Sequence, residues 1–272
     1  MNCALIDVDR VVRERAGSRA RYIPRCVTAW LARFIHQDYV NTYLRQGRTG
    51  VDFCQGALEY LGVTVEVEGT ENLPSDDEPC TFVSNHPLGA IDGVTLGAVL
   101  GAHYDGRIKI LVNDLLMNLE GLAPLCIPVN KLGRNSRQLA TLIDEAYASR
   151  NHIITFPAGL CSRQARRGGE IRDLTWTSSF VKKSVSAHRR VVPIHFVGEN
   201  SPRFYRVARW CKRLGLKVNL AMLLLPDEMV RSRGSHYRVV IGKPLPPDTF
   251  DASHTAAEWA EWMQCQVYSM HN

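Results

Sequence analysis

The stretch that most constrains the fold is residues 81–93, TFVSNHPLGAIDG. Its short apolar run, ending at Ser84, predicts a buried strand that delivers His86 to the point where the strand stops. Pro87 disfavours helical backbone at His86, because the proline ring clashes with the residue before it. Asp92 then lies at the mouth of a segment of small and apolar residues that predicts a buried helix. A strand, a histidine, a tight turn, an aspartate and a helix therefore form one unit.

The histidine and the aspartate of this unit suit general-base catalysis. Histidine ionises near neutral pH, and a carboxylate on one ring nitrogen fixes the tautomer and stabilises the imidazolium that forms when the other nitrogen takes a proton. On this interpretation His86 activates a hydroxyl or an amine, and Asp92 orients the ring. The alternative is that Asp92 caps the following helix and His86 is a partly buried turn residue.

Strands and helices alternate along most of the chain. Strands are expected at 63–68, 81–84, 107–113, 125–129, 152–156, 190–197 and 237–242, and helices at 136–150, 176–188 and 202–217. This alternation predicts an α/β fold, with a mixed, largely parallel sheet flanked by helices. Ligands of such sheets bind beyond the carboxyl ends of the strands, so His86 and Pro157 are expected to face one pocket.

The first 62 residues are expected to be helical. Apolar residues recur at helical intervals over 25–45, which predicts one amphipathic helix, and residues 51–61 predict a second, ended by Gly62. The apolar face of the first helix could pack on the core or lie in a membrane interface. We therefore expect an N-terminal helical segment at 1–62 packed on an α/β domain at 63–272.

His86 and Asp92, with Asn85 before and Gly93 after, resemble the first motif of the lysophospholipid acyltransferase superfamily. The usual form of that motif is Asn-His-x4-Asp, and the interval here is one residue longer. The stretch NHPLGAIDG is most similar to a bacterial subgroup of hemolysin-like acyltransferases.

Three later segments extend the resemblance over roughly 63–242. Residues 156–162, FPAGLCS, stand where the family has Phe-Pro-Glu-Gly-Thr-Arg-Ser. Residues 191–194 resemble its fourth, apolar block, and 127–130 resemble the second. Ala158 and Cys161 replace the glutamate and arginine that the family associates with a glycerol phosphate acceptor, which puts that acceptor in doubt.

The resemblance implies an acyltransferase of membrane lipid biosynthesis. It would move a fatty acyl group from a thioester of acyl carrier protein or coenzyme A to the hydroxyl of a lysolipid, either a lysophospholipid or a lyso-aminolipid. His86 would be the general base and Asp92 its partner, with no resident cofactor or metal. N-acylation of a free amino acid is an alternative within the same mechanism.

Substrate-binding residues are expected around the third block. Backbone amides near Gly159 could serve the oxyanion, and Arg163, Arg166 and Arg167 could bind an anionic group, since guanidinium groups match phosphate and carboxylate. Asn85 and Ser162 complete the expected binding set. The arginines could equally form a solvated loop. Cys161 is a further alternative, as the nucleophile of a thiol enzyme.

Charge and composition limit the surroundings. The chain has 33 basic and 27 acidic residues, and the net charge of +6 favours anionic partners. The sequence lacks zinc-finger, leucine-zipper and RNA-binding signatures, so we do not expect nucleic acid to be the partner. Eight scattered cysteines without a zinc spacing indicate a reducing compartment.

The location follows from the same patterns. No secretory signal and no apolar run of spanning length is found, so we expect a cytoplasmic protein bound peripherally to the inner face of the cell membrane. Residues 202–217, basic and aromatic, could rest on anionic lipid head groups or lie along the protein's own surface. A membrane-surface binding module without turnover is the non-enzymatic alternative.

Overall fold

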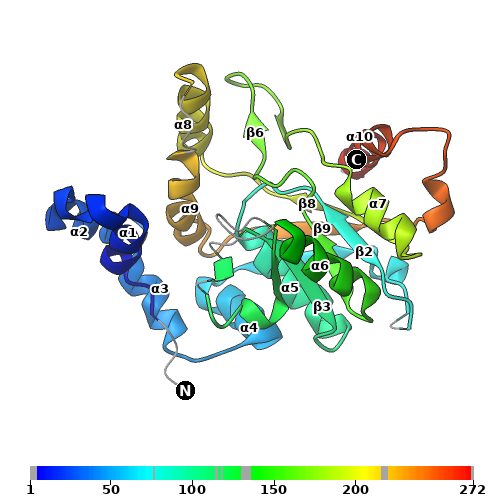
Figure 1. Cartoon of the computed structure of the whole chain (residues 1–272), viewed down its shortest axis with the longest axis horizontal. Coiled ribbons are helices and arrows are strands. Elements are labelled where there is room, and N and C mark those ends of the chain that lie inside the picture. Colours follow the sequence, from blue (N-terminus) through cyan, green and yellow to red (C-terminus); the bar gives the residue numbers. More distant parts are fainter. Residues whose placement is uncertain are drawn as a thin grey trace.

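A seven-stranded sheet forms the centre of the computed structural model, which describes residues 5–75, 77–113, 116–117, 119–129, 136–215 and 220–270 (Figure 1). The strands are β1 Thr64–Glu68, β2 Thr81–Ser84, β3 Ile108–Val112, β4 Cys126–Pro128, β5 His152–Thr155, β8 Val191–Val197 and β9 His236–Ile241. Their order is β1-β9-β8-β2-β5-β3-β4, and only the β8–β9 pair within this sheet is antiparallel. The predicted mixed, largely parallel sheet is confirmed.

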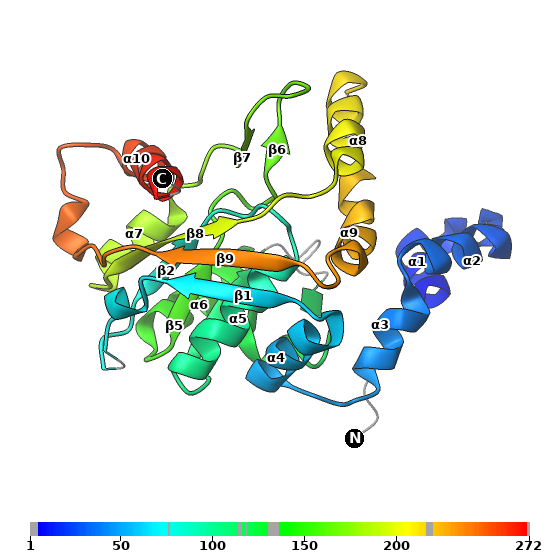
Figure 2. The same ribbon diagram turned by 180° about the vertical axis from the view of Figure 1, so that it is seen from behind.

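Helices cover both faces of the sheet. They are α4 Gly50–Leu61 and α5 Ile91–His103 on one face, and α6 Ser136–Ala148, α7 Ser179–Ser186 and α10 Ala256–Ser269 on the other (Figures 1 and 2). Strand β2 shows why both faces of the sheet must be covered, because its successive side chains point to opposite sides and need a packing partner on each. Phe82 packs in the core with Leu96 of α5, whereas Val83 packs with Phe180 of α7. All four residues of β2 are buried.

The N-terminal region contains α1 Val8–Ala16, α2 Arg25–Phe34 and α3 Gln37–Leu44. The expectation of one helix over 25–45 is wrong, because the backbone of His36 turns into the left-handed region at φ 55° and separates α2 from α3. Its ring is held there by Asp227, whose Oδ1 lies 2.8 Å from His36 Nε2. Phe34 packs with the core of α8 and α9. The division of the chain at residue 62 stays a prediction.

Several segments that follow β5 in the chain lie beyond the carboxyl ends of the strands. They are the hairpin of β6 Arg163–Gln164 and β7 Ile171–Arg172, followed by α8 Pro202–Arg213 and α9 Leu225–Arg231. Short 3-10 turns occur at Gly17–Tyr22, Thr70–Asn72, Ala123–Leu125, Leu220–Leu224 (η5) and Pro247–Thr249. The hairpin replaces the expected loop. None of the helices in the described ranges is long and apolar enough to span a bilayer.

Candidate active site

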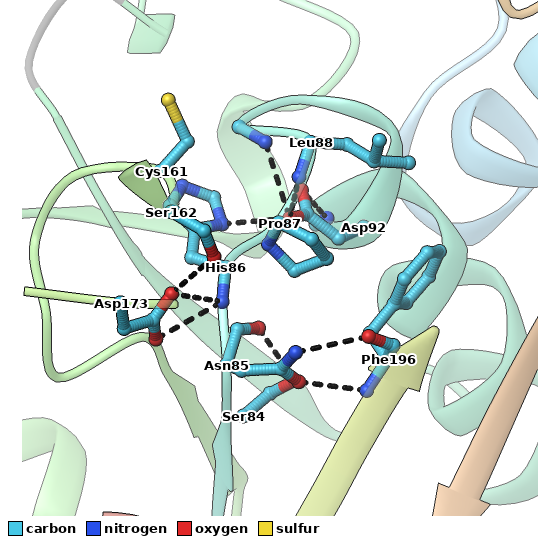
Figure 3. Close-up of polar contacts among 12 residues, drawn as sticks. Ser84, Asn85, His86, Pro87, Leu88, Asp92, Cys161, Ser162, Asp173 and Phe196 are labelled. Atoms are coloured by element: carbon cyan, nitrogen blue, oxygen red, sulfur yellow. Dashed lines mark hydrogen bonds and ion pairs between the residues drawn. The ribbon is translucent and has the colours of Figure 1, made fainter. Parts of the chain in front are cut away.

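His86 and Asp92 form an ion pair at the end of β2, with 2.9 Å between His86 Nδ1 and Asp92 Oδ2 (Figure 3). The short path from β2 through the turn into the first turn of α5 brings the two side chains together. The His86 side chain is 16% exposed and that of Asp92 is fully buried. Because Nδ1 faces the carboxylate, Nε2 is the ring nitrogen left for a substrate.

The turn itself holds Asp92. Its Oδ2 accepts hydrogen bonds from the amides of Leu88 at 3.0 Å and Gly89 at 3.1 Å, and its Oδ1 accepts one from the amide of Gly93 at 2.9 Å. Gly89 has a φ of +80°, a conformation that favours glycine. Burial would raise the pKa of Asp92, but the positive charge of His86 and these amides hold it below its usual value. Asp92 is therefore a carboxylate built to face the histidine, and Ala90, not Asp92, caps α5.

The surroundings of His86 favour its protonated form. Burial would lower the pKa of His86, but the negative charges of Asp92 and Asp173 outweigh burial and raise it. The ring of Phe156 lies beside it, with 4.3 Å between the ring centroids. A proton taken up by this imidazole is thus stabilised by two buried carboxyl groups.

Asp173 is the residue of this site that the sequence analysis missed. It follows β7, and both of its carboxylate oxygens accept from the amide of His86 at 3.2 Å (Figure 3). Oδ1 also accepts from Ser162 Oγ at 2.6 Å, and Oδ2 from Trp176 Nε1 at 2.9 Å. Burial raises the pKa of Asp173 in spite of these donors. No sequence motif marks this aspartate as part of the site, since His86 lies 87 residues away along the chain.

Asn85 and Ser162 are placed within the scaffold beneath His86. Asn85 is buried and pairs with the backbone of Phe196 in β8, through its Nδ2 at 2.9 Å and its Oδ1 at 2.7 Å. The amide of Ser162 donates to the carbonyl of His86 at 2.8 Å. Both residues therefore tie the histidine turn to its neighbours, and neither lies on the wall of the cavity described below.

Gly159 lies on the wall of that cavity, but its amide is already used. It donates to the carbonyl of Phe156 at 2.9 Å in a tight turn, so an oxyanion would need a neighbouring amide, and the role of Gly159 in binding stays a prediction. A substrate could still approach closely, because a Cβ built at Gly159 would meet no atom within 4 Å.

The three arginines of the hairpin have different surroundings. Arg163 lies under α8, where its Nη1 donates to the carbonyl of Cys161 at 2.7 Å and its guanidinium covers the ring of Phe204 at 5.2 Å. Its Nη2 is buried and has no hydrogen-bond partner among the described residues. Arg166 and Arg167 are exposed at the tip of the hairpin and do not line the cavity. Arg163 is not on the wall of the cavity either, but it is close enough to the histidine for its charge to act against the raised pKa of His86.

A largely apolar cavity of about 1180 Å³ opens at His86. It lies at the carboxyl edge of the sheet, where Val112 and Thr155 end their strands and contribute to the wall. From there it reaches the helices of both faces: the wall includes Tyr43 and Phe53 from α3 and α4, and Tyr147 and Phe180 from α6 and α7. Its size exceeds the usual range for small-molecule pockets, roughly 300–1,000 Å³, and its lining suits long hydrocarbon chains.

A family model described as Acyltransferase matches residues 10–272. The chain belongs to this acyltransferase family, within the lysophospholipid acyltransferase group whose first motif it resembles.

Particular relatives are similar over nearly the full length. The chain is 52% identical to a lyso-glycine lipid O-acyltransferase of Phocaeicola vulgatus over 98% of this chain and 95% of the relative. It is 50% identical to a lyso-glycine lipid O-acyltransferase of Bacteroides thetaiotaomicron over 98% of this chain and 97% of that relative. The crystal structure of the 1-acyl-sn-glycerophosphate acyltransferase PlsC from Thermotoga maritima is similar in fold, with a TM-score of 0.50 and 15% identity over 81% of this chain and 77% of that one.

Proposed function

We propose that this enzyme acylates the hydroxyl of a lyso-glycine lipid, with His86 as the general base. The observation that carries the proposal is the buried Asp92 carboxylate 2.9 Å from His86 Nδ1, at the mouth of an apolar cavity. The two relatives above support the acceptor class and the O-acyl product. N-acylation of a free amino acid has no such support.

The reaction follows from the free Nε2 of His86. This nitrogen takes the proton of the acceptor hydroxyl as the oxygen attacks the thioester carbonyl, while Asp92 stabilises the imidazolium. The carbon–sulfur bond then breaks, the thiolate takes the proton back from the imidazolium, and His86 returns to its neutral state. No covalent bond to the enzyme is required.

The acceptor head group gives Arg163 a role. A glycine acylated on its nitrogen keeps its carboxylate, so the acceptor would be an anion. Arginine binds carboxylates strongly, and the Nη2 of Arg163 is a buried donor without a partner among the described residues. We assign the carboxylate of the acceptor to Arg163 and its apolar chain to the cavity.

The acyl donor is a thioester of acyl carrier protein or coenzyme A, and the enzyme works at a membrane surface, where its acceptor and product reside. The purified protein should be offered labelled acyl groups on each carrier in turn, together with a lyso-glycine lipid, lysophosphatidate and free glycine. Mild alkali cleaves an ester and spares an amide, so it tells O-acylation from N-acylation of the product.

His86→Ala provides the control for the base. Loss of a general base typically costs ~10²- to 10⁴-fold in rate. Labelled, alkali-labile glycine lipid made by the wild type and nearly absent with folded His86→Ala supports the proposal. Transfer at an undiminished rate by His86→Ala, or transfer to lysophosphatidate or glycine alone, overturns it.

A further inference from the structure

Helix α8 presents an unusual outer face. Arg206, Trp210 and Arg213 lie four and three residues apart and therefore share one side of the helix, while Phe204 and Cys211 are buried on the other. Trp210 is 67% exposed. Leu214, directly after the helix, is 66% exposed. We call the four residues Arg206, Trp210, Arg213 and Leu214 the α8 face.

Helix α2, which contacts the N-terminal end of α8, carries further aromatic side chains. The guanidinium of Arg203 lies over the ring of Phe34 at 5.4 Å, and Phe34 stacks on Trp30 at 5.3 Å between ring centroids. Trp30 is 62% exposed. Large aromatic side chains flanked by arginines are thus exposed on two neighbouring helices.

Charge is concentrated on the same side. Residues 202–213 include five basic side chains and no acidic one, and residues 25–34 include two basic and no acidic. Arg203 forms an ion pair with the buried Asp227 at 3.0 Å, whereas Arg206 and Arg213 form no ion pair with a described residue. The hairpin of β6 and β7, whose tip carries Arg166 and Arg167, stands beside α8 (Figures 1 and 2).

We propose that the α8 face, together with Trp30, docks on a bilayer that contains anionic phospholipid. Basic residues draw a protein to an anionic leaflet, and tryptophan and leucine then insert at the level of the head groups. An acidic carrier protein would satisfy the charges, but it leaves no reason for tryptophans and a leucine to be exposed by half or more. The exposed apolar side chains therefore favour the bilayer.

The cavity supports the same orientation. Its wall includes Leu31 of α2 and Ile35 directly after that helix. It also includes Met222 and Leu223 of η5, which packs against α8. A lysolipid leaving the bilayer at the α8 face would thus be next to apolar wall that leads to His86. This route rests on the proposed lipid substrate, whereas the docking itself does not.

The experiment measures binding of the full chain to vesicles of phosphatidylcholine with and without phosphatidylglycerol, by co-sedimentation. Arg206→Gln/Arg213→Gln should lower the partition coefficient on phosphatidylglycerol vesicles by roughly 30-fold, about fivefold per arginine. Trp210→Ala/Leu214→Ala should weaken the binding that persists at high salt, where charges are screened. Lys182→Gln and Trp262→Ala are the matched controls, since both side chains are exposed and their helices, α7 and α10, lie at the opposite end of the molecule from α8 in Figure 1.

Acyl transfer to a detergent-dispersed acceptor separates docking from catalysis. We expect the two variants of the α8 face to lose vesicle binding and the two control variants to keep it. Acyl transfer in detergent should be unchanged in all four. Equal binding by all variants overturns the proposal. So does unchanged vesicle binding with selective loss of transfer from acyl carrier protein, which would assign the face to the carrier. If the wild type binds vesicles through the α8 face but transfers no acyl group, the proposed function is refuted and the proposed docking surface is not.

Discussion

Replacing Asp92 by asparagine removes one charge from the site and keeps the shape of the side chain. Oδ2 of Asp92 contacts His86 Nδ1 and two amides, while Oδ1 accepts, among the described residues, only the amide of Gly93. An asparagine with its carbonyl oxygen in the Oδ2 position keeps the first three contacts and places its NH₂ group against Gly93. An asparagine with its NH₂ group in the Oδ2 position would lose the contacts with His86 Nδ1 and with both amides. We therefore expect Asp92→Asn to keep the histidine tautomer and to lose the charge and one hydrogen bond.

The size of each effect follows from this geometry. The Gly93 amide and the new NH₂ group then lack acceptors, and each such buried donor costs about 1–3 kcal/mol, a loss that a domain stable by roughly 5–15 kcal/mol survives in most of that range. The rate should fall further, because a neutral amide does not stabilise an imidazolium as a carboxylate does. We expect a loss within the ~10²- to 10⁴-fold range of general-base catalysis.

The pH dependence has a definite sign. The charge of Asp92 is one of the causes that raise the pKa of His86 against the effect of burial, so removing it lowers that pKa. The base works as neutral imidazole, and kcat/KM falls as pH drops through the pKa of His86 in the free enzyme. The acid limb of the profile should therefore move to lower pH in Asp92→Asn.

The assay is kcat/KM as a function of pH, with urea unfolding in parallel. Asp52→Asn is the matched control, since Asp52 is 64% exposed and pairs only with Arg48 at the surface. A folded Asp92→Asn enzyme with the wild-type rate and an unmoved acid limb would refute the assignment of Asp92 as the partner of the base.

Three further changes probe the neighbours of the histidine. Asp173→Asn removes a second charge that raises the pKa of His86, so its acid limb should also move to lower pH, with about 1–3 kcal/mol lost in urea unfolding; an unmoved limb would restrict Asp173 to a structural role. Arg163→Gln should raise KM for an acceptor with a free carboxylate and leave KM for the corresponding glycine amide unchanged, and equal effects on both would contradict the carboxylate assignment. Cys161→Ser should keep transfer near the wild-type rate, because burial raises the pKa of the Cys161 thiol and keeps it protonated at neutral pH, whereas an inactive but folded variant would restore the thiol mechanism.

The pairing of His86 with Asp92 was readable from the sequence because its geometry is local. His86 and Asp92 are six residues apart, and a strand, a proline turn and the first turn of a helix leave the two side chains little freedom. The strands were readable for a similar reason: β2 and β5 are buried throughout, and each has two adjacent apolar residues at its centre. The resemblance to acyltransferases depended on the same local motif.

Long-range contacts decided the rest. Asp173 binds the amide of His86 from 87 residues away, and Asn85 pairs with Phe196 across 111 residues, so neither role leaves a local pattern. The break at His36 depends on Asp227, 191 residues further on, which an amphipathic period cannot reveal. The amide of Gly159 is taken by a turn that the family motif does not specify. The sequence by itself determined that His86 meets Asp92 and what class of sheet forms, because short covalent paths and burial patterns dictate them. The tertiary structure decided which groups surround the base, because hydrogen bonds between distant segments exist only after the chain has folded.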